Sequence, residues 1–330
     1  MDIFANFSVL VYMILWVYAL MWPVITTFIF ISVPYYVLPY LTTFTLTYGL
    51  FIVLDQNAAN TGGRSRGRWL IDWYESICEG CQRYFSMKLV KTADLPPTTN
   101  YIFCIHPHGP FGFGVGCSLL AKNMAHMFPK LVRHLVHIPL LSWAPFVREM
   151  LLFRGCVSCS RESVDCILKT PPTEHEAKAL MILVGGGKEI QYVAPGKMTI
   201  VLKHRQGFAR MALRHGSALV PVWIFGENNV YLRPQSEIMM NLERKLMAFS
   251  KKHKRGFCMM YGRFGTLFPL RRPITTVVGR PIPVKKWTDS AEPPSDVVDQ
   301  LHKVYCQELT RLYDEHKKSY GYEDVQLEFV

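Results

Sequence analysis

Residues 101–116 are YIFCIHPHGPFGFGVG, and this stretch decides how the larger part of the chain folds. Its first five residues, Tyr101 to Ile105, form a compact apolar run, which predicts a buried strand. The run ends directly in His106-Pro107-His108-Gly109, and Gly112, Gly114 and Gly116 follow. Histidine can move a proton at neutral pH, and a glycine-rich turn lets a substrate carbonyl approach backbone N–H groups. A histidine pair that only hydrogen-bonds a tight turn is the alternative, which the proline and the glycines disfavour.

The chain after residue 60 alternates short apolar runs with amphipathic segments, which predicts an α/β domain. Further strands are expected at Ala179 to Val184, Leu219 to Phe225 and Ile274 to Val278. A last helix is expected from Ser295 to Tyr320. Ligands of open α/β sheets bind beyond the carboxyl ends of the strands, so the loops after the first three strands form the candidate site.

The N-terminal segment contains no ionisable acid or base between Asp2 and Asp55. One membrane crossing takes about 20 residues, so this segment is long enough for two. Pro34 and Pro39 interrupt its middle and predict a transmembrane hairpin, at roughly residues 5–32 and 36–54. We therefore expect a membrane-anchoring hairpin in residues 1–58 and a catalytic domain in residues 59–330.

Charge and cysteine content indicate a compartment and a class of partner. Arg64, Arg66 and Arg68 follow the second apolar segment, and basic residues beside a span mark its cytosolic side. Nine cysteines, an odd number, fit a reducing compartment better than a disulfide framework. The formal net charge of +12 implies anionic partners such as membrane lipids or substrate phosphates. Nucleic acid is not expected, because no recognition motif for it is present.

Two motifs suggest chemistry that the rest of the chain does not support. The pairs Cys78/Cys81 and Cys156/Cys159 suggest zinc, but the spacer between them far exceeds that of zinc sites, so no metal is expected. Gly63-Arg64-Ser65-Arg66-Gly67 fits a hydrolase nucleophile motif but lacks the strand and helix that this motif needs.

Several ordered motifs between residues 83 and 321 carry a family resemblance. Besides the histidine turn they are Arg83-Tyr84-Phe85, Pro145-Phe146-Val147-Arg148-Glu149, Gly185-Gly186-Gly187-Lys188-Glu189, Arg205-Gln206-Gly207-Phe208, Leu219 to Asn228 and Val278 to Ile282. Together they resemble the type-2 acyl-CoA:diacylglycerol acyltransferases with their monoacylglycerol and wax-ester relatives. The resemblance implies a glycerolipid-acyltransferase-like sheet domain, acyl-CoA as a substrate with no cofactor, and diacylglycerol, monoacylglycerol or a fatty alcohol as acceptor.

The resemblance also implies a location in the endoplasmic reticulum membrane. The catalytic domain would face the cytosol, and the lipid droplet is a second expected location. The oligomeric state is left open, and a homo-oligomer is compatible with the sequence.

The resemblance implies that the two histidines are catalytic, with His108 as general base and His106 in support. Better-known glycerolipid acyltransferases have an Asp five positions after this histidine, where this chain has Phe113. An orienting carboxylate would then come from another loop, with Glu189 and Glu227 as candidates. The residues expected to bind substrate are Gly109, Gly112, Gly114, Arg148, Gly185, Gly186, Gly187, Lys203, Arg205, Glu227 and Asn228.

Two basic segments are candidates for phosphate contacts. The segment expected to hold coenzyme A contains Lys197, Lys203, Arg205, Arg210 and Arg214. The run Lys251 to Arg255 is either a membrane contact or a solvated face.

The expected reaction is direct acyl transfer without an acyl-enzyme. Cys104, Cys117 and Ser118 lie near the histidines but outside any recognisable nucleophile arrangement. Two other classes of function remain open at this point: a lipid hydrolase that uses the same histidine, and a non-catalytic lipid-droplet scaffold.

Overall fold

The computed structural model describes residues 2–62, 68–252, 258–289 and 292–330, so Arg64, Arg66 and the motif at 63–67 lie outside the described residues. Within these ranges seven strands form one sheet, in the order β1-β8-β7-β2-β5-β3-β4. The strands are β1 (Lys88–Lys91), β2 (Tyr101–His106), β3 (Leu131–His137), β4 (Val157–Ser158), β5 (Ala177–Leu183), β7 (Ala218–Phe225) and β8 (Thr275–Val278). The four strands expected from the sequence are confirmed, with ends shifted by one or two residues.

The central strands are parallel and buried on both faces. β2 pairs in parallel with β5 on one side and with β7 on the other, and β7 pairs antiparallel with β8. Alternate residues of β2 enter different cores: Phe103 lies in one cluster and Cys104 in the other. This two-sided burial explains why the strand is a continuous apolar run without polar alternation.

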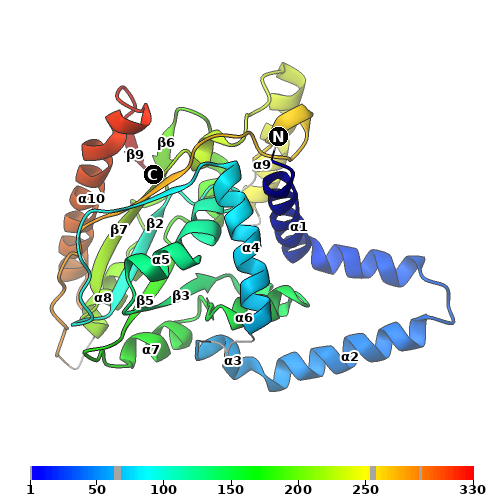
Figure 1. The fold of residues 1–330 in the computed structure, drawn as a ribbon, viewed down its shortest axis with the longest axis horizontal. Helices are drawn as coiled ribbons and strands as arrows, with labels where there is room; N and C mark the ends of the chain where they lie inside the picture. Colours follow the sequence, from blue (N-terminus) through cyan, green and yellow to red (C-terminus); the bar gives the residue numbers. More distant parts are fainter. Residues whose placement is uncertain (1, 63–67, 253–257, 290–291) are drawn as a thin grey trace.

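Helices cover both faces of the sheet (Figure 1). One core contains residues of α4 (Arg68–Tyr84), α5 (Lys122–Met127) and α6 (Val147–Phe153). The other contains residues of α7 (Arg161–Lys169), α8 (Gly207–His215) and α10 (Ser295–Lys317). The expected α/β class is confirmed, and α10 is the last helix that the sequence predicts. A two-stranded sheet of β6 (Met198–Ile200) and β9 (Leu327–Phe329) and helix α9 (Glu237–Lys252) lie outside this sandwich.

The apolar N-terminal segment forms two helices, α1 (Ile3–Ser32) and α2 (Leu38–Leu54), followed by the short α3 (Gln56–Asn60). α1 is long and apolar enough to cross a membrane, whereas α2 is a shorter apolar helix. Figure 1 shows their outer parts extending away from the domain as a hairpin. The first half of α1, however, packs against α4, and its residues Ala5, Val9, Tyr12 and Met13 belong to the core.

Candidate active site

The first histidine of the turn, His106, is the last residue of β2 and is fully buried. The Tyr305 hydroxyl lies 3.1 Å from His106 Nε2 and 3.3 Å from the carbonyl oxygen of Cys104. A carbonyl only accepts, so the hydroxyl donates to Cys104 and Nε2–H of His106 donates to the hydroxyl oxygen. Burial, followed by the charge of nearby His108, lowers the pKa of His106 to about 3. The ring is therefore neutral at physiological pH.

The second histidine, His108, lies nearer the surface than His106. Its Nε2 is 2.8 Å from the carbonyl oxygen of Gly186, in the loop that follows β5. Nε2 therefore carries the proton that donates to this carbonyl, and Nδ1 carries the lone pair of the neutral ring. A side chain built at Gly186 or Gly187 would meet no atom within 4 Å, so the loop beside His108 borders open space.

Glu189 holds the main chain of the histidine turn. Its carboxylate is buried and accepts the N–H of His108 at 3.3 Å and that of Val201 at 3.2 Å. Burial raises the pKa of Glu189, and the charge of His108 acts in the opposite direction. A side chain at Gly185 would lie 1.9 Å from Glu189 Oε2, which explains the glycine at that position. Glu189 thus orients the loop through its backbone.

Glu227 hydrogen-bonds the backbone of the glycine-rich part of the same loop. It is fully buried after β7, and its two oxygens accept the N–H groups of Phe113 at 2.8 Å and Gly114 at 2.9 Å. These amides begin the helical segment that contains the π-helix Val115–Leu119. Burial raises the pKa of Glu227 to about 7, although both amide bonds favour the ionised form. Gly109 has φ +59°, and a Cβ there would lie 2.6 Å from Glu227 Cγ.

The other expected binding residues differ in how close they come to this loop. Gly112 also has a positive φ, of +61°. Arg205 reaches the loop, with Nη2 3.3 Å from the carbonyl oxygen of Gly185, whereas Lys203 is exposed. Asn228 is buried next to Glu227, and its Oδ1 has no hydrogen-bond partner among the described residues.

Arg148 of α6 lies against the end of α2, where the hairpin joins the catalytic domain. This buried side chain contacts the Asp55 carboxylate through Nη2 at 2.6 Å and the Glu149 carboxylate through Nη1 at 2.7 Å. Its guanidinium also lies over the ring of Phe51, near the end of α2. The structure thus ties α6 to α2 through Arg148 and does not bring this side chain to the histidine turn.

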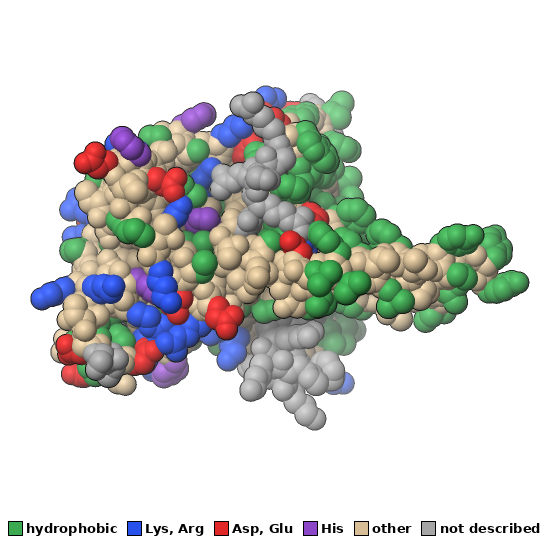
Figure 2. Space-filling model, turned by 90° about the horizontal axis from the view of Figure 1, so that it is seen from below, with side chains coloured by type: hydrophobic (Ala, Val, Ile, Leu, Met, Phe, Trp, Pro, Cys, Tyr) green, Lys and Arg blue, Asp and Glu red, His purple; other side chains and the backbone are tan. Residues whose placement is uncertain are grey.

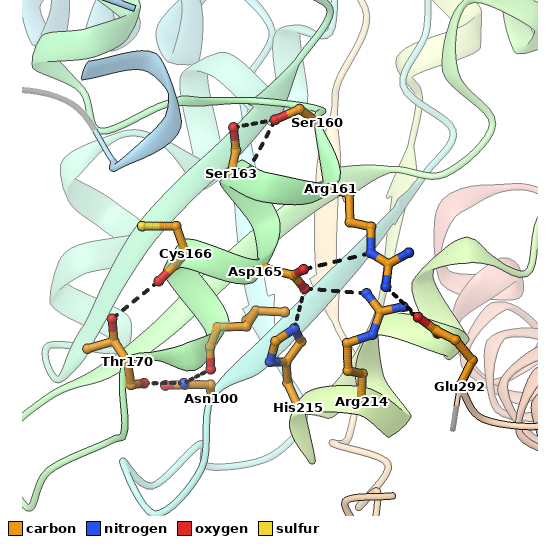
Figure 3. Close-up of polar contacts among 11 residues, drawn as sticks. Asn100, Ser160, Arg161, Ser163, Asp165, Cys166, Thr170, Arg214, His215 and Glu292 are labelled. Carbon is orange, nitrogen blue, oxygen red and sulfur yellow. Dashed lines mark hydrogen bonds and ion pairs between the residues drawn. The ribbon is translucent and has the colours of Figure 1, made fainter. Parts of the chain in front are cut away.

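Arg214, the last member of the first basic segment, is already paired. Its guanidinium contacts Asp165 and Glu292, and His215 Nε2 lies 2.7 Å from the same Asp165 (Figure 3). This network precedes the amino end of β7, on the sheet edge opposite the histidines. Lys197, Lys203, Arg205 and Arg210 are left as candidates for phosphate contacts. In the second basic run, residues 253–255 lie outside the described residues.

The thiols near the histidines are buried. Cys104 and Cys117 are both inaccessible, and burial raises the pKa of each thiol. The thiolate is the reactive form of cysteine, so neither side chain is placed as a nucleophile. Among the described residues no group of three or more His, Cys, Asp or Glu side chains could hold a metal ion.

Two cavities lie away from the histidine turn. One is lined by Glu75 and Arg154 among others. The other lies beside Arg148 and Ser158, where α2 and α3 meet the catalytic domain. No residue of 106–109 or 185–189 lines either of these two cavities. The candidate site is therefore identified by the hydrogen bonds around the two histidines and not by a cavity.

Two residues of this site were not expected from the sequence. Tyr305 lies within the last helix expected from the sequence, at Ser295 to Tyr320, but no role at the site was predicted for it. Tyr12 lies in the apolar hairpin, and its hydroxyl donates to the carbonyl oxygens of Phe111 at 3.2 Å and Gly112 at 3.1 Å. No distinct signal in the sequence identifies Tyr12, because Ser8, Tyr18 and Thr26 of the same apolar helix also carry hydroxyl groups. A buried hydroxyl needs an acceptor, but which hydroxyl is buried depends on how α1 packs.

Comparison with known proteins gives consistent matches. Residues 35–330 match the sequence model of a family described as diacylglycerol acyltransferase. The chain is 37% identical to 2-acylglycerol O-acyltransferase 1 of Bos taurus, over 86% of this chain and 82% of that protein. It is 35% identical to diacylglycerol O-acyltransferase 2 of Danio rerio, over 84% and 76%, respectively. It is 33% identical to acyl-CoA wax alcohol acyltransferase 1 of Homo sapiens, over 84% of each.

A solved structure is more distantly similar. It is the 1-acyl-sn-glycerophosphate acyltransferase of Thermotoga maritima, with a TM-score of 0.41 and 12% sequence identity, over 88% of this chain and 96% of that one. A likeness this distant bears on neither the site nor the substrate.

Proposed function

The chain belongs to the diacylglycerol acyltransferase family, and we propose that it transfers an acyl group from acyl-CoA directly to the free hydroxyl of diacylglycerol, forming triacylglycerol. One observation carries the proposal. The turn at the carboxyl end of β2 places His108 beside the open space at Gly186 and Gly187, while two buried carboxylates hold the turn.

His108 is the general base. The Gly186 carbonyl fixes the tautomer with the proton on Nε2, which leaves Nδ1 to accept a proton. The acceptor hydroxyl oxygen attacks the thioester carbonyl carbon while Nδ1 takes the hydroxyl proton. General-base assistance of this kind contributes roughly 10²–10⁴-fold to the rate. Glu189 accepts the backbone N–H of His108 at 3.3 Å and so keeps the turn that carries the ring in place.

The developing oxyanion needs hydrogen-bond donors near the reacting carbon. We assign this role to backbone N–H groups of Gly109 and of Gly185 to Gly187, because both segments adjoin the His108 ring. When the tetrahedral intermediate collapses, the carbon–sulfur bond breaks and coenzyme A leaves as a thiolate, which then takes the proton from His108. No acyl-enzyme is needed, and the burial of Cys104 and Cys117 supports a direct transfer.

Basic side chains beside the loop after β5 indicate where the phosphates of the acyl donor, acyl-CoA, bind. Arg205 reaches the carbonyl oxygen of Gly185, and Lys203 is exposed two residues before it. We assign the coenzyme A phosphates to this side of the loop, since Arg and Lys are the usual phosphate ligands of proteins.

A second acceptor, monoacylglycerol, is favoured by one observation. The 37% identical relative from Bos taurus is named a 2-acylglycerol O-acyltransferase. Both acceptors present the same reacting hydroxyl, so the shape of the acceptor pocket would decide between them.

The proposed location is the endoplasmic reticulum membrane with the catalytic domain on the cytosolic side, and the lipid droplet in addition. Two observations support a membrane location: the apolar helix α1, and the separation of apolar from basic side chains on the surface of the protein. Figure 2 shows apolar side chains gathered on the hairpin and the adjoining flank, with Lys and Arg mostly on the far flank.

A competition assay tests the function. Purified protein in lipid nanodiscs receives labelled acyl-CoA with equal amounts of diacylglycerol, monoacylglycerol and a long-chain alcohol, and a parallel sample receives no acceptor. We expect triacylglycerol as the main product and no label on the protein in the parallel sample. Free fatty acid as the main product would indicate a hydrolase, and no product from any acceptor would indicate a scaffold. A label on the protein that an acceptor discharges would replace direct transfer with a two-step mechanism.

A further inference from the structure

Helix α9 carries an apolar stripe that faces away from the protein. Ile238, Leu242 and Leu246 are 80%, 44% and 38% exposed. Their spacing of four residues places them on one face of the helix. The side that packs on the domain is marked instead by Glu243, which is buried and paired with Arg233. Glu243 is the one buried residue among residues 237–248, so the apolar stripe of α9 is not placed in the core as in most surface helices.

One flank of this stripe carries the exposed Lys245, which lies beside Ile238 and Leu242 on the helix surface, whereas Arg244 lies on the opposite side. The helix ends in Lys251 and Lys252, and His253-Lys254-Arg255 follow in the sequence. An outward apolar stripe with basic residues beside it is typical of helices that lie in the plane of a membrane interface. The basic residues favour a surface that carries anionic lipid headgroups.

The base of α9 adjoins α1. The Tyr231 hydroxyl, shortly before α9, lies 3.9 Å from Met13 Sδ of α1. Met260, shortly after α9, packs on the core cluster to which residues of α1 belong. The outer face of this part of α1 is also apolar and exposed, at Phe7 and Ile14. Figure 1 shows α9 next to the start of α1, whose far end continues into the hairpin. The stripe on α9 therefore continues the apolar flank from which the hairpin extends.

We propose that α9 is a second membrane-contact element, which lies in the interface of a bilayer bearing anionic lipids while the hairpin is inserted. This inference rests on the proposed membrane location and goes beyond it, because it assigns a contact to the catalytic domain itself. Helix α9 is also connected to the candidate active site through Arg233. The Arg233 guanidinium contacts the carboxylate of Glu243 on α9 and donates to the carbonyl oxygen of Gln191. Gln191 lies in the 3₁₀ helix Gly186–Tyr192, which begins beside His108. Docking of α9 thus fixes the orientation of the catalytic loop relative to the membrane.

The test uses photo-crosslinking in the full-length protein. A benzophenone amino acid replaces Ile238, and the protein is placed in phosphatidylcholine vesicles with or without phosphatidylserine, each with a radiolabelled phospholipid. The same residue at Phe28, which is exposed in the outer part of α1, is the positive control for membrane insertion. At Asn241, exposed on the polar face of α9, it is the negative control.

We expect lipid adducts at positions 28 and 238 but not at 241, with more adduct at 238 when phosphatidylserine is present. The double variant Leu242→Asp/Leu246→Asp should lower the adduct at 238 at least about tenfold, because two charges oppose burial of the stripe. The matched variant Asn241→Asp/Ala248→Asp adds the same two charges at exposed positions outside the stripe and should lower the adduct by much less, through repulsion from the anionic lipid alone.

Adducts at 28 without adducts at 238 would overturn the inference while leaving the membrane location intact. A protein adduct at 238 in place of lipid would also overturn it, because the stripe would then bind another chain. The absence of adducts at both positions would refute the membrane location itself.

Discussion

His106 and His108 are two residues apart and yet differ in their burial and in their hydrogen-bond partners. His106 is enclosed, neutral and bonded to Tyr305, whereas His108 borders open space and has its tautomer set by a backbone carbonyl. In this account His108 is the catalytic residue. His106 and Tyr305 are positioning residues, since they hold the end of β2 from which the turn begins.

Loss of the Tyr305 hydroxyl should affect turnover more than stability. In Tyr305→Phe the ring still packs, but His106 Nε2 and the Cys104 carbonyl lose their shared contact. We expect kcat to fall roughly fivefold with unchanged KM values, because a net hydrogen bond is worth about 1 kcal/mol, which corresponds to about a fivefold change in rate. Tyr313→Phe is the matched control: this buried tyrosine of α10 bonds the Val325 carbonyl at 3.0 Å. An equal fall of kcat in both variants would reduce Tyr305 to a packing residue.

Glu227 should make stability depend on pH. Its pKa is raised from 4.5 to about 7 in the folded protein, so between these values the folded state holds a proton that the unfolded state has lost. The contribution of Glu227 to stability is therefore fully present below about pH 4.5 and is lost as pH rises to about 7, by roughly 3 kcal/mol in total. Glu227→Gln removes this titration.

The measurement is thermal unfolding in detergent at about pH 5 and about pH 8. The midpoint of the unmodified protein should fall between these two values by more than that of Glu227→Gln. Other titrating groups, including His106, are common to both proteins and cancel in the comparison. Parallel shifts in both proteins would show that Glu227 is already ionised at the lower pH.

At the scale of elements, α1 combines two roles. Its outer half belongs to the hairpin, and its inner half lies on α4 and reaches the loop after His108 through Tyr12. Gly116 permits this approach, because a Cβ there would lie 2.3 Å from the Tyr12 hydroxyl. The division between anchor and catalytic domain at residue 58 stays a prediction, and the core contacts show that part of the anchor also supports the catalytic loop.

Tyr12→Phe should therefore lower activity without releasing the protein from membranes. Two carbonyl oxygens of the loop, at Phe111 and Gly112, lose their donor. We expect kcat to fall about fivefold to tenfold, while sedimentation with carbonate-washed membranes is unchanged. Tyr36→Phe, at the exposed turn of the hairpin, is the control and should have neither effect. Full activity of Tyr12→Phe would mean that α1 contributes only anchoring.

The four strands β2, β5, β7 and β8 were predictable because each is a compact apolar run that ends at Gly, Pro or a polar residue, and because two-sided burial leaves a strong signal. Strands such as β1 (Lys88–Lys91) and β3 (Leu131–His137) contain charged or histidine side chains and were not predicted. Residues such as Tyr101 and Phe103 belong to such a run regardless of their partners. The carboxylates Glu189 and Glu227 were predictable as candidates because each ends a strand and its loop. Their actual contacts, with backbone amides of the histidine loop, depend on side-chain directions that spacing does not encode.

Other parts of the site could not be predicted for the same reason. Arg148 lies in a family motif, but its pairing with Asp55 depends on where α2 ends against α6. Tyr305 and Tyr12 are far from the histidines in sequence, and each enters the site through tertiary packing of a helix. A periodic pattern identifies which face of a helix is buried but not what that face contacts.

At the scale of the whole molecule, the hairpin is short for a complete crossing. Trp22 is the last residue of α1 that packs on the core, so residues 23–32 extend beyond the docked part, and α2 has 17 residues. At 1.5 Å per residue these segments span about 15 and 25 Å, less than the roughly 30 Å of a bilayer core. We therefore expect both ends of the hairpin on the side of the catalytic domain and its turn buried in the membrane.

Cysteine labelling tests this depth. In Tyr36→Cys the new thiol should resist a membrane-impermeant maleimide from either side of sealed vesicles and react only after detergent is added. Cys166, exposed on the catalytic domain, serves as the internal control for sidedness. Peptide mapping distinguishes the two sites. Labelling of position 36 from the side opposite to Cys166 would show a full crossing.

The central claim is that His108 is the base in a direct transfer, and the turnover of two purified histidine variants tests it most directly. With saturating acyl-CoA and diacylglycerol, His108→Ala should lose at least about a hundredfold in kcat, and His106→Ala should lose less. Unfolding midpoints measured beside the rates identify any loss that comes from misfolding. Near-normal turnover by a folded His108→Ala, together with an inactive but folded His106→Ala, would contradict the account.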